Sequence, residues 1–83
     1  MIHLSQHMRE QLALRTELRQ EWIEAEVTQP DWTAADPDPT LTRSYKAIVA
    51  YGGRVIRVVH RPVGADVLVV TAHFDRGAFL FFL

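Results

Sequence analysis

Residues 45–61 read YKAIVAYGGRVIRVVHR, and this stretch decides the fold. Apolar and polar side chains alternate on both sides of the Gly52-Gly53 pair, which is typical of two half-buried β-strands. Two consecutive glycines supply the positive φ angles of a two-residue hairpin turn. The sequence therefore predicts a hairpin with strands 45–51 and 54–61. The turn sets these pairs: Tyr51 with Arg54, Ile48 with Arg57, and Tyr45 with His60.

A third strand is expected after this hairpin. Residues 62–66, PVGAD, combine proline and glycine and predict a longer turn. Residues 67–75 alternate again, and Gly77 follows them. A five-residue turn would pair Arg61 with Val67 and would therefore place Arg57 opposite Thr71.

Because successive side chains along a strand point to opposite sides, this register sorts the sheet into two faces. The face expected under the helices holds Tyr45, Ala47, Val49, Tyr51, Ile56, Val58, Leu68, Val70, Ala72 and Phe74, with Arg54 and His60 at its ends. The opposite face holds Lys46, Ile48, Ala50, Val55, Arg57, Val59, Arg61, Val67, Val69, Thr71, His73 and Asp75.

Residues 3–28 contain no glycine or proline and carry apolar residues at helical spacing. The apolar stripe changes phase near residues 15–17, which favours two helices with a break between 15 and 19 and leaves one continuous helix open. Pro30 is expected to end the helical part. The predicted fold class is α+β: one domain, 1–83, with two N-terminal helices packed on one face of a three- to four-stranded antiparallel sheet over 41–77.

Two segments lie outside these elements. Residues 29–40 contain three prolines and three aspartates and predict a surface connection, held to the core by Trp32. Residues 78–83, AFLFFL, form an apolar tail. Because an exposed tail of this kind favours association, a two-fold homodimer through it is expected.

Composition narrows the possible function classes. The 83 residues include no cysteine, so disulfides, thiolate zinc sites and a cysteine nucleophile are excluded. No signal peptide or membrane span is recognisable, and a cytoplasmic location is the default expectation. Residues 1–40 carry three arginines against eight acids, whereas residues 41–83 carry six basic residues against two acids. Such asymmetry indicates an anion-binding face or an attraction between the two halves of the fold.

Arginine on a central strand is costly unless it is solvated or paired. One interpretation is that Arg57 reaches water or pairs with Asp75. The other is an anion site in which Arg57 and His73 are catalytic, His73 transferring a proton. The candidate phosphate-binding residues are Arg54, Arg57, Lys46, Arg61 and Arg76.

No cofactor and no metal are expected. His3 and His7 have the i, i+4 spacing at which helical imidazoles can share a metal, but no further ligand motif accompanies them.

Several motifs point to a known family. They are residues 3–15, the Pro30-Asp31 pair, GGRVIRVV at 52–59 and VVTAHFDR at 69–76. With these motifs the chain resembles the small bacterial proteins grouped as domain of unknown function 4258. The matching positions are His7, Arg15, Arg54, Arg57, Thr71 and Arg76. The sequence departs from the family where the usual R-G-I-S is replaced by residues 15–19, RTELR.

The resemblance implies a domain similar to the RelE/ParE/BrnT toxin superfamily, whose toxins cleave mRNA or block gyrase and pair with an antitoxin. One hypothesis is therefore an RNA-acting, ribonuclease-like toxin component with an antitoxin-like partner. The alternative is a non-catalytic protein-binding or dimerisation domain, which the acidic helices favour. The sequence leaves open whether the chain is an enzyme.

Overall fold

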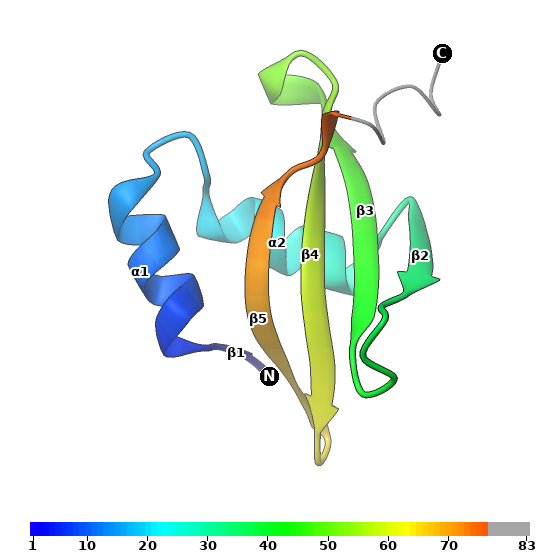
Figure 1. Ribbon diagram of the computed structural model, residues 1–83. Helices are drawn as coiled ribbons and strands as arrows, with labels where there is room; N and C mark the ends of the chain where they lie inside the picture. The colour runs from blue at the N-terminus through cyan, green and yellow to red at the C-terminus, as the bar shows by residue number, and fades with distance from the viewer. Residues whose placement is uncertain (77–83) are drawn as a thin grey trace.

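The computed structural model describes residues 1–76 and contains two helices and a five-stranded mixed sheet (Figure 1). The strands are β1 (Ile2–Leu4), β2 (Trp32–Ala35), β3 (Thr42–Ile48), β4 (Arg54–Val63) and β5 (Asp66–Phe74). The helices are α1 (Gln6–Leu14) and α2 (Gln20–Thr28). The α+β class and the two N-terminal helices are confirmed.

The strands lie in the order β1-β5-β4-β3-β2. Strand β1 pairs with β5 in parallel, and the other neighbours are antiparallel. The prediction of a three- to four-stranded antiparallel sheet is therefore wrong in two places. Residues 2–4 form a strand rather than the start of a helix, and residues 32–35 form a strand within the proline-rich connection.

Both unexpected strands satisfy the backbone groups of a neighbour that would otherwise be a bare sheet edge. In β2, the Trp32 ring stacks on Tyr45 with the ring centroids 4.8 Å apart. Trp32 thus holds the connection to the sheet as expected, but as part of a strand. Neither helix among the described residues is long and apolar enough to cross a membrane.

The helical part breaks between Leu14 and Gln20, as the phase change in the stripe predicted. The Ser5 hydroxyl caps α1 by accepting a hydrogen bond from the Met8 amide at 3.0 Å. The same hydroxyl donates to the Val70 carbonyl of β5 at 2.9 Å. Helix α2 ends at Thr28, two residues before Pro30.

Helix α2 crosses behind β4 and β3, and α1 lies beside β5 (Figure 1). The main buried cluster joins the helices to the sheet through Met8, Leu18, Ile23, Ile48, Ile56, Val58, Val69 and Ala72. We call the side of the sheet turned toward α2 the inner face, and the opposite side the outer face.

The first hairpin has a different register from the predicted one. Val49–Tyr51 form a 3₁₀ turn, so Ile48 pairs with Arg54 and Tyr45 pairs with Arg57. Gly52 and Gly53 both adopt positive φ, at 68° and 76°, but they close a five-residue loop. A shift by three residues turns every β3 side chain to the other face.

The shift has a physical cause in aromatic packing. In the turn, the Tyr51 ring lies 5.0 Å from Phe74 and 6.0 Å from Trp22, measured between centroids. Val49, which the predicted register placed in the core, is 90% exposed. The aromatic contacts therefore outweigh the burial of one valine.

The second hairpin also differs from the prediction. Its loop is only Gly64-Ala65, and Pro62 lies inside β4, paired with Val67. Strand β3 pairs with β4 only as far as His60, so Pro62 loses no hydrogen bond on that side. A bulge after Val59 then shifts the pairing further.

Some residues lie on the predicted face of the sheet, and others lie on the opposite face. Ile56, Val58 and Ala72 are buried on the inner face and Phe74 packs against them, as predicted. Tyr45 and Ala47 instead lie on the outer face, and Ile48 and Lys46 on the inner face. Beyond the bulge, Val69 rather than Leu68 or Val70 joins the core.

Candidate functional site on the outer face

The outer face brings Arg57 and His73 directly together. They are cross-strand partners on β4 and β5, rather than Arg57 and Thr71 as the predicted register had it. The Arg57 Nη2 and His73 Nε2 atoms are hydrogen-bonded. Arg57 Nη1 also lies 3.5 Å from a carboxylate oxygen of Asp75, as the first of the two interpretations expected.

This contact indicates which ring nitrogen of His73 carries the proton. A guanidinium has only donors, so Nε2 must be the acceptor and the ring proton must sit on Nδ1. Burial lowers the pKa of His73, and the charge of Arg57 lowers it further, while Asp75 opposes the shift. The neutral imidazole is therefore the form present at pH 7.

The Arg57 side chain contacts His73 and Asp75 and remains partly exposed to solvent. Its exposed fraction is 24%, whereas its Nε is buried and has no hydrogen-bond partner among the described residues. The part of the Arg57 guanidinium that is open to solvent is suited to an anionic ligand.

Further groups surround this pair. Arg43 follows on the same face of β3, two residues from Tyr45, and its Nε lies 2.8 Å from an Asp36 oxygen. The charges of Arg15 and Arg43 also lower the pKa of His73. The Tyr45 ring, stacked on Trp32, lies beside Arg57 because the two residues are cross-strand partners. The candidate site thus combines the Arg57 guanidinium with a neutral histidine, beside the buried Tyr45 ring and the Arg43–Asp36 ion pair.

The other predicted phosphate-binding residues do not join this site. Lys46 lies on the inner face, where its Nζ donates to the Gln29 carbonyl at 2.9 Å. Arg61 is exposed near the tip of β4, four residues beyond Arg57. Arg54 lies at the end of the inner face, as predicted, over the Phe74 ring, and Arg76 follows β5.

Two positions shared with the resembled family, Thr71 and His7, lie outside this site. The Thr71 hydroxyl donates to the Gln11 side-chain oxygen at 2.8 Å, and His7 is exposed on α1. His3 lies in β1 and its Nε2 is 2.9 Å from Asp66, so His3 and His7 do not share a helix turn. Within residues 1–76, no group of three or more potential metal ligands is present.

Arg43, Asp36 and the Trp32–Tyr45 stack were not expected as parts of the site, and Arg15 was named only as a position shared with the resembled family. Arg43 alternates correctly with Tyr45 along the strand. The wrong hairpin register concealed this relation, because it placed Tyr45 on the inner face.

Comparison with known protein families, with curated proteins and with solved structures gives no match to this chain.

Proposed function

We propose that the outer face binds RNA and that Arg57 and His73 act on its phosphodiester backbone. The observation that carries this proposal is the contact between a part-exposed guanidinium and a neutral imidazole on neighbouring strands.

The chemistry supported by this pair is proton transfer next to a phosphate. A neutral imidazole can take the proton of a ribose 2′-hydroxyl, and a guanidinium can stabilise the charge that develops on phosphorus oxygens. The 2′-oxygen then bonds to phosphorus, the bond to the 5′-oxygen breaks, and water protonates the leaving oxygen. RNA is the substrate because DNA lacks this hydroxyl.

In the ligand-free protein the Nε2 lone pair of His73 is engaged by Arg57. A phosphate would compete for the guanidinium, because charged acceptors form the stronger hydrogen bond. Ligand binding would therefore release Nε2 and, by its negative charge, raise the pKa of His73. Arg57 thus holds the base in place until substrate arrives.

The test is an RNA binding and cleavage assay with the wild type, Arg57→Gln and His73→Gln. We expect Arg57→Gln to weaken binding and both variants to lower cleavage by at least about a hundredfold. Arg61→Gln is the matched control, since Arg61 lies on the same strand but outside the site. The proposal fails if wild-type protein neither binds nor cleaves RNA, or if the control loses as much as Arg57→Gln.

A second candidate function is non-catalytic binding of another protein. It is favoured by β2, which is a terminal strand of the described sheet with exposed residues from Thr33 to Ala35. An extended peptide can pair with such an edge. Replacing Thr33 or Ala35 with proline would abolish partner binding under this alternative and would leave RNA cleavage intact under the first proposal.

A further inference from the structure

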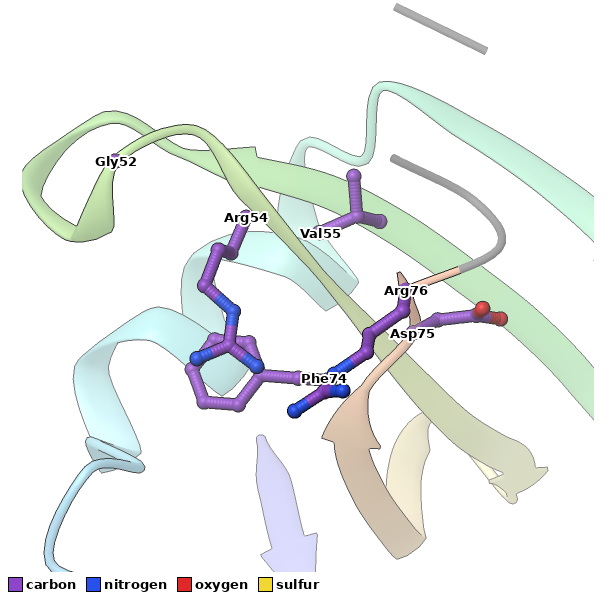
Figure 2. Close-up of a pocket in the computed structure, with 6 residues that line it drawn as sticks. All are labelled: Gly52, Arg54, Val55, Phe74, Asp75 and Arg76. Atoms are coloured by element: carbon purple, nitrogen blue, oxygen red, sulfur yellow. The ribbon is translucent and has the colours of Figure 1, made fainter. Parts of the chain in front are cut away.

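A hollow of about 360 Å³ lies where β4 begins and β5 ends, apart from the Arg57–His73 pair (Figure 2). The described residues that line it are Gly52, Arg54, Val55, Phe74, Asp75 and Arg76. Its size is within the range of pockets that hold small organic ligands.

Two guanidinium groups line this hollow. Arg54 lies 4.3 Å from the centroid of the Phe74 ring and 5.3 Å from that of Tyr51, and these rings fix its position. The Arg76 side chain extends toward the same region (Figure 2). Among residues 1–76, the ion pairs found include neither arginine.

The acidic side chain of the lining is directed elsewhere. The Asp75 carboxylate points away from both guanidinium groups (Figure 2), and it lies 3.5 Å from Arg57. Two positive charges in one pocket repel each other unless an anion joins them. The described lining therefore offers charge +2 with its one carboxylate turned outward.

We propose that this pocket binds a nucleoside phosphomonoester, with its phosphate on Arg54 and Arg76. A phosphomonoester carries a charge of about −1.5 to −2 at pH 7, which matches two guanidinium groups better than a singly charged phosphodiester does. Apart from the charged groups, the described lining is mostly apolar, which suits the nucleoside.

The same chemistry occurs in a free mononucleotide and at the phosphorylated 5′ end of RNA. This inference goes beyond the proposed RNA chemistry and does not depend on it, because none of the side chains assigned to the phosphate touches His73 in a described contact. Loss of cleavage in Arg57→Gln would therefore not contradict the proposed phosphomonoester pocket.

The experiment is a calorimetric titration of the full chain with adenosine monophosphate, adenosine and inorganic phosphate. We expect adenosine monophosphate to bind at least about tenfold more tightly than either of the other two. Arg54→Gln and Arg76→Gln should each weaken its binding about tenfold or more, and Arg61→Gln should not. Because Arg76 is exposed, its replacement tests the pocket even if Arg54→Gln perturbs folding.

A second arm compares one short RNA with a 5′-phosphate and with a 5′-hydroxyl. If the phosphorylated RNA binds more tightly and Arg76→Gln removes this preference, the pocket recognises RNA ends. If the two RNAs bind equally and the mononucleotide binds tightly, the pocket recognises the free nucleotide. The inference is overturned if adenosine monophosphate binds no better than adenosine or inorganic phosphate, or if Arg76→Gln leaves its affinity unchanged.

Discussion

At the scale of single residues, Glu26 is an acidic side chain in the interior of the protein. It is fully buried between α2 and the sheet, and neither carboxylate oxygen has a hydrogen-bond partner among the described residues. Burial raises the pKa of Glu26 to about 9, against the opposing effects of the Lys46 backbone amide and ammonium; Asp31 raises it as well. Glu26 is therefore protonated in the folded protein at pH 7.

This protonation makes stability depend on pH. In the unfolded chain the Glu26 carboxyl ionises near its ordinary pKa of 4.5, whereas in the folded protein it keeps its proton up to about pH 9. The free energy of unfolding should thus fall as pH rises through this window, by roughly 1 kcal/mol per pH unit. Glu26→Gln should remove this dependence and stabilise the protein at pH 8.

Urea unfolding of Glu26→Gln at pH 5 and pH 8 measures the effect. Glu24→Gln is the control, because Glu24 is exposed on the same helix. Equal pH dependence in the wild type and Glu26→Gln would mean that the buried carboxyl is not neutral.

At the scale of elements, α1 protects the edge of β5 that β1 leaves uncovered. Ser5 joins the helix cap to the Val70 carbonyl, and the Gln11 amide donates to the Ala72 carbonyl at 3.4 Å. A helix normally shields a sheet by apolar contact, whereas here polar side chains also satisfy strand backbone groups.

Ser5→Ala should therefore lower the free energy of unfolding by about 2 kcal/mol, since it removes the cap and leaves the Val70 carbonyl without this donor. Thermal unfolding compared with Gln6→Ala, an exposed neighbour, measures the difference. A loss within about 0.5 kcal/mol of that control would contradict the double role of Ser5.

Elements also show what the sequence could predict. The helix break, the strand that contains Ile56 and Val58, and the outward position of Arg57 and His73 followed from spacing alone. The register did not, because Tyr45, Ala47, Val49 and Tyr51 alternate as a strand would, whereas distant contacts of Tyr51 with Trp22 and Phe74 select a 3₁₀ turn. Strand β1 was missed because it has only three residues, which form no recognisable pattern, and because its partner β5 lies far away in the sequence.

The same long-range effects conceal polar features. Glu26 was not expected in the core, because carboxylates are almost never fully buried unless they are paired. The site could be predicted only in part: the outward position of Arg57 and His73 and the inner position of Arg54 follow from alternation along their own strands, while the position of Tyr45 beside Arg57 needs the correct hairpin register.

At the scale of the whole molecule, some acidic residues of the first half form ion pairs with basic residues of the second half. Asp36 pairs with Arg43, and Asp31 lies 3.9 Å from Lys46, so acids of the first half meet bases of the second. The expected attraction between the two halves of the fold is therefore observed in these two pairs. The basic residues left for a ligand gather on β4 and at the end of β5.

Few available cations mean a modest dependence of RNA affinity on salt. With two or three phosphates neutralised, the logarithm of the association constant should fall against that of salt concentration with a slope of about −2. Arg57→Gln should make this slope shallower by about 0.7, and Arg61→Gln should not change it. Binding that does not respond to salt would contradict phosphate recognition.

The homodimer predicted through residues 78–83 belongs to the same scale, but that tail lies outside the described residues. It remains a prediction. Sedimentation of the full chain beside a chain that ends at Gly77 tests it, and equal masses would reject a role of the tail in association.

The central claim is that Arg57 holds a neutral His73 ready on the outer face. A long-range ¹H–¹⁵N NMR titration of His73, in the wild type and in Arg57→Gln, tests it most directly. The account predicts a proton on Nδ1, a pKa below the ordinary histidine value of 6.5, and a rise in this pKa when Arg57 is replaced or when RNA is added. A His73 pKa at or above that value which responds to neither change would contradict the account.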